Sequence, residues 1–164
     1  MTAEPRINRL RRWAEPAISR GMHLYWRFAR PMTLGVRGLV LNGSGEVFLV
    51  KHSYAAGWHM PGGGVEAGET LLQALARELM EEGNIVVAGP PRLHGVFFNA
   101  HASRRDHVGV YVVREFRQDG APVPDREIVA HGFFAPDALP PDTTPGTRRR
   151  LAEVLQGAPI SPHW

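Results

Sequence analysis

Gly62-Gly63-Gly64-Val65-Glu66-Ala67-Gly68-Glu69-Thr70, followed by the run Arg77-Glu78-Leu79-Met80-Glu81-Glu82-Gly83-Asn84-Ile85, is the stretch that decides how this chain folds. It has the character of a glycine-rich loop that leads into an amphipathic helix. Thr70 and Gln73 have the spacing of a capping box, which predicts that the helix begins at about Leu71. The sequence therefore places a loop and a helix N-terminus side by side.

The predicted helix carries an acidic cluster beside an apolar stripe. Four apolar side chains recur at helical spacing and are expected to form the buried stripe: Leu72, Leu75, Ala76 and Leu79. Glu78, Glu81 and Glu82 project from a neighbouring arc, where they repel one another and have only Arg77 close by. Such a run alone is most often a solvated helix face. Hard divalent cations, however, take oxygen ligands of this kind.

The spacing of the wider segment resembles the signature of the Nudix hydrolases. Gly63 is followed after five residues by Glu69, after seven more by Arg77-Glu78, and after two more by Glu81-Glu82. At roughly one chance in fifteen per position, six fixed positions match by accident in on the order of one window in 10^7. The one departure is Asn84, which stands where the family has glycine. Asparagine also adopts the left-handed conformation that ends a helix, so the turn is expected to survive.

The resemblance implies a metal-dependent hydrolase. Family members use magnesium or manganese to cleave a nucleoside diphosphate linked to another group, and Mg²⁺, with Mn²⁺ as the alternative, is the cofactor expected here. By resemblance, Glu78 and Glu82 are the primary metal ligands, Glu81 is an additional ligand, and the Gly63 carbonyl joins them. The glycines let the backbone approach metal and phosphates closely.

The resemblance also implies catalytic residues around this cluster. Glu69 is expected to act through an ion pair with Arg77 that fixes the loop against the helix, and a purely structural role for it stays open. The general base varies within the family. It is either a glutamate of the signature, such as Glu81, or an acid in a later loop, where Glu127 precedes Ile128.

Four further residues are candidates for substrate binding: Lys51, Arg37, Gly62 and Trp58. Lys51 aligns with a basic residue that contacts phosphate in some relatives, although a lone lysine is usually solvated. Trp58 could stack on a base, although aromatic residues beside a sheet more often fill the core. His52 and His59 flank the expected pocket.

An α/β fold is expected, and the resemblance implies an α/β/α sandwich with a mixed sheet over about residues 33–157. Residues 42–45 are predicted to form a hairpin turn between strands 33–41 and 47–51. Thr144 is expected to cap a last helix that begins at Pro145 and ends at about Leu155. The remaining predicted strands are 85–88, 93–99, 108–116 and 128–134.

Length and composition favour one catalytic domain, residues 33–164, in a chain of 164 residues. The absence of cysteine excludes disulfides, thiolate zinc sites and thiol nucleophiles. No apolar run approaches the ~20 residues of a membrane span, and arginines interrupt the N-terminus where a signal core would lie. The cytoplasm is the expected location.

Residues 1–32 are predicted to form a basic, amphipathic, helical extension. Seven arginines and two glutamates give residues 1–30 a net charge of +5. This arm is expected to pack its aromatic face on the domain or on a partner subunit, which would make a homodimer. The alternative is that it lies on a membrane or on RNA, which would bind with a steep dependence on salt.

The sequence thus favours a pyrophosphohydrolase of a small nucleotide-type substrate, with nucleoside triphosphates favoured because the chain adds little to the fold besides the arm. Two alternatives stay open. One is a catalytically weak domain that senses a nucleotide ligand, and the other is an enzyme that acts on RNA 5′ ends through the arm.

Overall fold

The computed structural model describes residues 32–122 and 127–164. The chain divides into two units, Met1–Met32 and Thr33–Trp164, and the fold is that of the second. Apart from Met32, the predicted basic arm lies outside the described residues.

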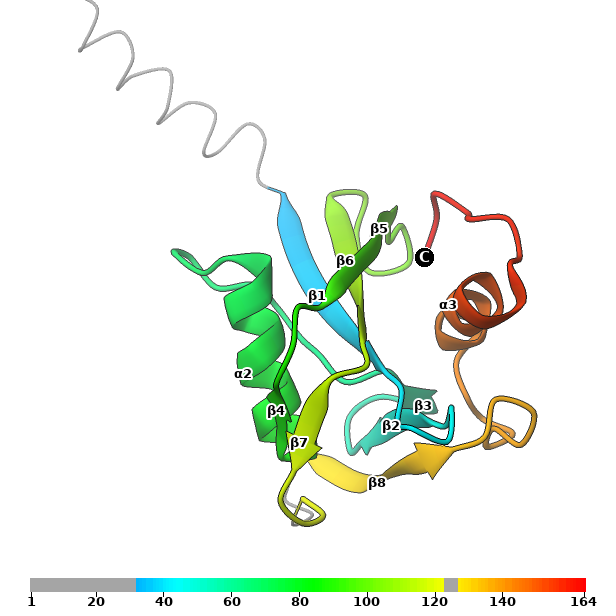
Figure 1. Cartoon of the computed structure of the whole chain (residues 1–164). Coiled ribbons are helices and arrows are strands. Elements are labelled where there is room, and N and C mark those ends of the chain that lie inside the picture. Colours follow the sequence, from blue (N-terminus) through cyan, green and yellow to red (C-terminus); the bar gives the residue numbers. More distant parts are fainter. Residues whose placement is uncertain (1–31, 123–126) are drawn as a thin grey trace, which may run out of the picture. The chain divides into compact units, whose positions relative to one another are not determined.

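Three small sheets form the centre of the fold (Figure 1). The first is mixed, because its middle strand runs parallel to one neighbour and antiparallel to the other; its order is β1 (Thr33–Val40), β6 (Asp106–Val113) and β5 (Arg92–Phe98). The second is antiparallel, with the order β3 (Trp58–His59), β2 (Val47–His52) and β8 (Ile128–Phe134). The third pairs β4 (Ile85–Val87) with β7 (Phe116–Gln118).

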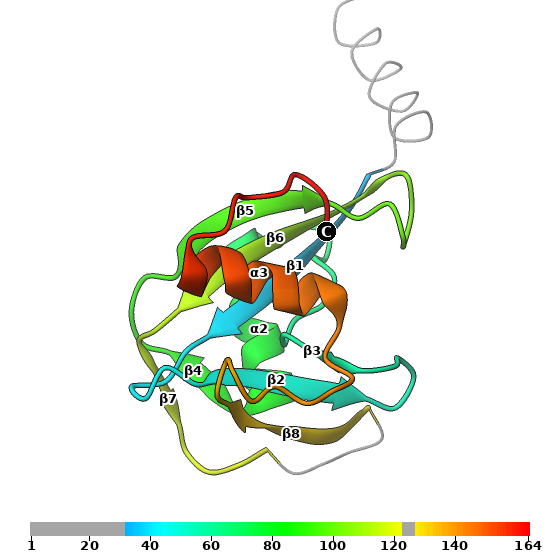
Figure 2. The same cartoon turned by 90° about the vertical axis from the view of Figure 1, so that its right-hand side faces the viewer.

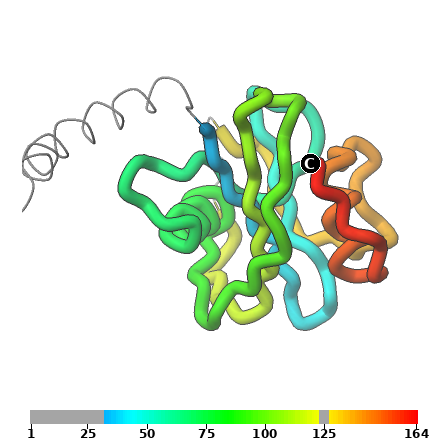
Figure 3. The backbone as a smooth tube through the Cα atoms, turned by 90° about the horizontal axis from the view of Figure 1, so that it is seen from above, coloured from blue at the N-terminus to red at the C-terminus, as the bar shows by residue number. Residues whose placement is uncertain are grey.

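Helices α2 (Leu71–Gly83) and α3 (Pro145–Gln156) cover opposite sides of these sheets. In Figure 2, α3 lies in front of the strands and α2 behind them, and Figure 3 shows the same layers from above. Each side has its own buried cluster, one containing Leu75 and Leu79 of α2 and the other Leu151 of α3. The predicted α/β/α arrangement with a mixed sheet is confirmed. Within the described residues, neither helix has the length and apolar character needed to cross a bilayer.

Local signals place both ends of α2 where the sequence predicts them. The Thr70 side chain accepts a hydrogen bond from the Gln73 N–H at 3.2 Å, and the Gln73 side chain accepts one from the Thr70 N–H at 2.9 Å. At the other end Asn84 has φ 50° and ψ 37°, and its N–H reaches the carbonyls of Leu79 and Met80. Asparagine therefore ends the helix in the left-handed conformation, as predicted for it in place of glycine.

The predicted hairpin between β1 and β2 is wrong. The chain does turn at residues 42–45, but the two strands share only the bridge between Leu41 and Val47 and belong to different sheets. Val36, Leu39 and Val40 of β1 are fully buried. A strand enclosed in this way suits a parallel partner inside a layered fold, so pairing with the distant β6 replaces the local hairpin.

The predicted strand 108–116 is two strands. The exposed Arg114 and Glu115 follow β6, and the chain then continues as β7 on a different sheet. There the ring of Phe116 stacks against Phe133, with centroids 6.0 Å apart.

The N-cap of α3 differs in detail from the predicted one. The Thr144 hydroxyl hydrogen-bonds Thr147 Oγ1 and makes no side-chain hydrogen bond to the helix backbone.

The buried face of α2 is rotated from the predicted stripe. Leu72 is 47% exposed and Ala76 is also exposed, whereas Ala74, Leu75 and Leu79 are buried. Glu82 is 6% exposed and continues this buried face. The helix therefore carries the Glu82 carboxylate into the protein interior. The sequence predicted this carboxylate on an arc of the helix outside the core.

Candidate active site

Glu78 and Glu82 of α2 face the glycine-rich loop. Glu82 has only 8% of its side chain exposed, and its Oε2 accepts a 2.7 Å hydrogen bond from the Gly62 N–H. Glu78 has 12% of its side chain exposed and lies against Gly63, where a Cβ atom would collide with its carboxylate. Glycine at position 63 is therefore what lets the loop backbone and this carboxylate approach each other.

The same loop is held against β1 by backbone hydrogen bonds. The Val36 N–H donates to the Gly63 carbonyl at 2.9 Å, and the Gly38 N–H donates to the Pro61 carbonyl at 2.8 Å. Gly62 has φ +136°, and a Cβ there would collide with the Val36 carbonyl. The loop thus lies between β1 and α2 with its backbone polar groups close to the acidic side chains.

Arg77 ties the loop to the helix. Its guanidinium donates to both Glu69 oxygens at 3.0 and 3.1 Å, to Glu78 at 2.8 Å and to the Gly64 carbonyl at 3.1 Å. A longer contact of 3.3 Å reaches Glu81. The hydrogen bonds from Arg77 lower the pKa of the Glu69 carboxyl. The predicted ion pair between Glu69 and Arg77 is therefore present, within a wider network.

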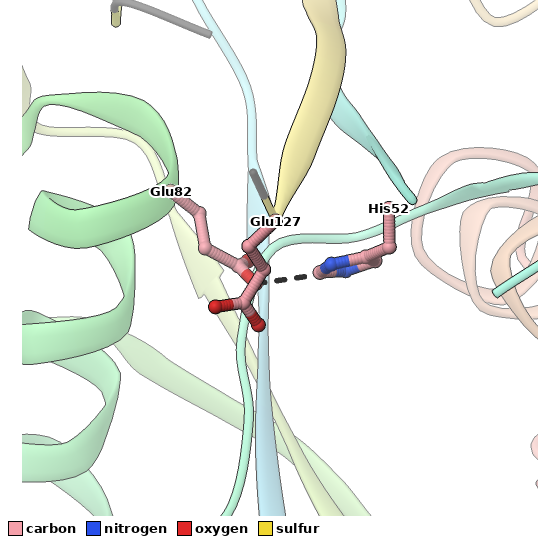
Figure 4. A group of neighbouring side chains, drawn as sticks. All are labelled: His52, Glu82 and Glu127. Carbon is pink, nitrogen blue, oxygen red and sulfur yellow. Dashed lines mark ion pairs between the residues drawn. The ribbon is translucent and has the colours of Figure 1, made fainter. Parts of the chain in front are cut away.

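His52 and Glu127 meet Glu82 from other elements. His52 is the last residue of β2, Glu127 lies directly before β8, and the three side chains point toward one another (Figure 4). His52 Nε2 lies 3.5 Å from Glu82 Oε1. The Tyr54 hydroxyl donates to Glu127 Oε1 at 2.9 Å and fixes that carboxylate.

Burial sets the protonation of this group. It raises the pKa of Glu82 to about 7, against the lowering effects of the Gly62 N–H and Arg37. It lowers the pKa of His52 to about 4, and the nearby Arg37 and His59 lower it further. His52 is therefore neutral at pH 7 and does not offset the negative charge of Glu82. A bound cation would offset that charge.

The acidic side chains surround a cavity of about 210 Å³, lined by Glu78, Glu81, Glu82, Glu127 and Ile128. Carboxylates are the ligands that magnesium and manganese prefer. The position of Gly63, which leaves room for the Glu78 carboxylate, and the burial of Glu82 suit a bound divalent cation. The residues present therefore fit the metal that the sequence predicts.

A second hollow is lined by His59, whose ring centroid lies 5.7 Å from that of His52. Two connected spaces of about 200 and 510 Å³ share His59, Asn99 and Trp164, and the smaller also contains Arg37. Trp164 is placed there because residues 162–164 pair with β5: the Phe98 N–H donates to the Pro162 carbonyl at 2.9 Å, and the Trp164 N–H donates to the Phe98 carbonyl at 3.0 Å. This hollow combines an aromatic wall with two arginines, Arg37 and Arg149.

Most predicted site residues come together. The acidic cavity and the loop beside it contain Glu69, Arg77, Glu78, Glu81, Glu82, Glu127, Gly62 and Gly63. Lys51 is placed elsewhere, because its Nζ forms a 2.8 Å ion pair with Asp142. Trp58 packs edge-on against Phe134, with ring centroids 4.9 Å apart. Arg37 lines the second hollow and donates to the Met60 carbonyl at 3.0 Å.

Four residues carried little or no signal in the sequence: His52 and Tyr54, which contact the acidic residues, and Asn99 and Trp164, which line the second hollow. In the sequence, His52 only flanks the expected pocket, and Tyr54, Asn99 and Trp164 belong to no motif. His52 could have been recognised as inward-facing, because it shares one face of β2 with Phe48 and Val50, and the strand is buried along almost its whole length. Trp164 had no comparable local signal.

Comparison with known proteins gives consistent matches. A profile described as NUDIX domain matches residues 31–154. The "Putative 8-oxo-dGTP diphosphatase" of Bacillus subtilis (strain 168) is 28% identical over 128 residues, which are 77% of this chain and 82% of that protein. Diphosphoinositol polyphosphate phosphohydrolase 2 of Rattus norvegicus is 43% identical over 75 residues, 45% of this chain and 41% of that protein. The crystal structure of a MutT NUDIX hydrolase from Burkholderia pseudomallei superimposes with a TM-score of 0.65 at 28% identity, covering 76% of this chain and 98% of that one.

Proposed function

The chain belongs to the NUDIX family and is a pyrophosphohydrolase, and we propose that it cleaves the pyrophosphate bond of a nucleoside diphosphate linked to another group. The observation that carries this proposal is the convergence of Glu78, Glu81, Glu82 and Glu127 on one cavity beside a glycine-rich loop. A pyrophosphate is polyanionic, so its hydrolysis at such a site requires cations.

We propose Mg²⁺ as the cofactor, with Mn²⁺ as the alternative. Glu78 and Glu82 would hold the ion, with Glu81 and the Gly63 carbonyl as further ligands. When bound, a divalent cation lowers the pKa of a water molecule and screens the charge of the phosphates. The close approach of Gly63 to Glu78 supports this set of ligands.

Glu127 is the proposed general base, and Glu81 is the alternative. Glu127 lines the acidic cavity, where its carboxylate can take the proton of the attacking water. The Tyr54 hydroxyl holds one carboxylate oxygen and so orients the other. Arg77 and Glu69 act as positioning residues, since their hydrogen bonds hold the glycine-rich loop and the Glu78 carboxylate in place.

Nucleoside triphosphates are the proposed substrate class. The name of the Bacillus subtilis relative gives 8-oxo-dGTP as its substrate, which supports testing oxidised and ordinary triphosphates first. The second hollow has an aromatic wall, Trp164, for a base and two arginines, Arg37 and Arg149, for a phosphate. Lys51 and Trp58 stay predictions as substrate contacts, as Lys51 would have to leave Asp142.

Residues 33–164 are the proposed catalytic domain, and residues 1–32 the proposed basic extension. Activity is therefore expected to persist without the extension. A role of the extension in holding RNA would appear as a loss of salt-sensitive binding when it is removed.

Phosphate release from a substrate panel tests the proposal. The panel holds nucleoside triphosphates including 8-oxo-dGTP, ADP-ribose, dinucleoside polyphosphates, diphosphoinositol polyphosphate and triphosphorylated RNA, each with Mg²⁺ and with Mn²⁺. Glu127→Gln is expected to lower kcat by roughly 10^2- to 10^4-fold, the contribution typical of a general base. Asp137→Asn, a change at an exposed acid in the turn after β8, is the matched control and should leave turnover unchanged.

Metal-dependent turnover of one class, lost in Glu127→Gln, would support the proposal and name the substrate. A retained rate in Glu127→Gln with a loss in Glu81→Gln would move the base to Glu81. No turnover of any compound, together with tight nucleotide binding, would instead identify a ligand sensor.

A further inference from the structure

His52 is a buried imidazole whose nitrogens have no hydrogen-bond partner among the described residues. The residue is 5% exposed, and both Nδ1 and Nε2 lack a partner. Buried polar groups in folded proteins are nearly always hydrogen-bonded, because an unpaired one forfeits its hydration. The position of this ring therefore requires a partner that the side chains around it do not supply.

Packing explains where the ring lies but does not satisfy its nitrogens. His52 lies 5.0 Å from the Tyr54 ring and 5.7 Å from the His59 ring, measured between centroids. Neither nitrogen is hydrogen-bonded in these ring contacts. Glu82 Oε1 is 3.5 Å from Nε2, which is long for a hydrogen bond.

The nitrogen is aimed at two carboxylates from different elements. One ligand atom each from His52, Glu82 and Glu127 lies within 4.8 Å of the other two (Figure 4). An ion with ligand distances of about 2.1 Å holds its ligand atoms about 3 to 4 Å apart, so small side-chain rotations would close the three around it.

Two hydrogen bonds hold the carboxylates in this arrangement. Glu82 Oε2 accepts from the Gly62 N–H at 2.7 Å, which leaves Oε1 on the side of His52. Glu127 Oε1 accepts from the Tyr54 hydroxyl at 2.9 Å. Such supporting contacts are typical of metal ligands, because they fix the orientation of the donor atoms.

We propose that His52, Glu82 and Glu127 form a mixed nitrogen and oxygen site for a first-row divalent transition metal ion, for which Mn²⁺ is the probe, in preference to Mg²⁺. Imidazole is a good ligand for transition metals, whereas Mg²⁺ takes oxygen ligands and gives up its waters reluctantly. The inference rests on the proposed function, because Glu82 and Glu127 also belong to the hydrolytic centre. It adds His52 and Glu127 as ligands outside the signature and favours the alternative cofactor, Mn²⁺, over Mg²⁺. It also assigns the general base to Glu81, because a Glu127 carboxylate bound to the metal no longer takes the proton of the attacking water.

Electron spin echo envelope modulation of the full-length protein loaded with Mn²⁺ tests the inference directly. Wild type is expected to show the ¹⁴N coupling of a coordinated imidazole, replaced by ¹⁵N coupling when the protein is labelled with ¹⁵N-histidine. His52→Gln should abolish the coupling. His59→Gln, which changes the neighbouring ring whose Nε2 lies 3.0 Å from the Ala56 carbonyl, should retain it.

Metal affinity provides the second readout. His52→Gln is expected to weaken Mn²⁺ binding at least about tenfold, the lower end for losing a group that supports a metal site, and to leave Mg²⁺ binding within about threefold. Titration calorimetry of both variants measures this.

The outcomes separate the inference from the proposed function. Bound Mn²⁺ without ¹⁴N coupling in wild type overturns the inference, even if nucleotide hydrolysis is intact. Coupling that survives in His52→Gln also overturns it, and the wild-type spectrum decides the matter if that variant does not fold. Failure to bind either metal, with no hydrolysis, would instead remove the proposed function.

Discussion

The Glu82 side chain is almost enclosed, yet it carries a carboxylate that the proposed metal site needs ionised. It accepts a hydrogen bond from the Gly62 N–H, while burial raises its pKa and the nearby Glu78 and Glu127 raise it further. Burial of a charge destabilises the fold unless a partner offsets it. A glutamate that destabilises the fold at this position is more consistent with a role in a functional site than with a structural role.

Glu82 makes the stability of the metal-free protein depend on pH. Its pKa is raised from 4.5 to about 7 on folding, so its contribution to stability is fully present below pH 4.5 and is lost as the pH rises through 7. Glu82→Gln removes this loss and is expected to be more stable than wild type by about 1–3 kcal/mol at pH 8, with the difference disappearing toward pH 4.5. Urea unfolding in EDTA at several pH values measures it.

The titration of His52 does not change the stability difference between wild type and Glu82→Gln. His52 has its pKa lowered to about 4, so it adds stability above pH 6.5 that is lost as the pH falls through 4, in both proteins. A difference between wild type and Glu82→Gln that stays constant from pH 4.5 to 8 would contradict the assigned burial cost.

At the scale of elements, the site depends on how closely a loop and a helix approach. The glycine-rich loop is bonded to β1 through Val36 and Gly38, and Arg77 bonds it to α2. Glu78 and Glu82 are one helical turn apart and therefore share the face that meets this loop. Glu81, three residues after Glu78, lies at the edge of this face, with 59% of its side chain exposed.

Gly63→Ala is expected to disturb this contact alone. The added Cβ would collide with the Glu78 carboxylate, so we expect metal affinity to fall by about 10- to 100-fold, the range for loss of groups around a metal ligand. Gly43→Ala is the matched control, because a Cβ there meets nothing within 4 Å. Calorimetric titration with Mn²⁺ gives both affinities, and equal values in the two variants would argue against a role of Glu78 as a ligand.

At the scale of the whole molecule, the second hollow is built by a segment that pairs far from its own helix. The Arg150 guanidinium lies 3.8 Å over the Phe97 ring and donates to Glu153 Oε1 at 2.6 Å. The same oxygen accepts from the Ser161 N–H at 3.0 Å. This buried cluster fastens the last residues to β5 and α3, and so it fixes Trp164 at the wall of the hollow.

Trp164→Ala tests whether the hollow receives the base of the substrate. Loss of an aromatic contact worth about 0.5–1.5 kcal/mol is expected to raise KM by about threefold to tenfold and to leave kcat nearly unchanged. Steady-state kinetics on the substrate found in the panel measure both constants. Ile160→Ala is the control, as Ile160 is 60% exposed on the same segment. An unchanged KM would place the base elsewhere.

Much of the fold followed from local signals. The capping box of Thr70 and Gln73, the left-handed Asn84 and the strand 128–134 all lie where the sequence predicted them. These features depend on residues that are neighbours in the chain, so spacing alone is informative. The wrong hairpin and the split of strand 108–116 both concern pairing between distant segments, on which local spacing is silent.

The sequence by itself determined the family and the reaction class. The signature consists of acids, an arginine and glycines that are close together in the chain, so their spacing can be read directly from the sequence. Only the tertiary structure decided which glutamate is buried, that His52 and Glu127 join Glu82, and that Trp164 lines the neighbouring hollow. Those relations arise when β2, β8, α2 and the last residues pack together, and packing between segments far apart in sequence leaves no periodic trace in any one of them.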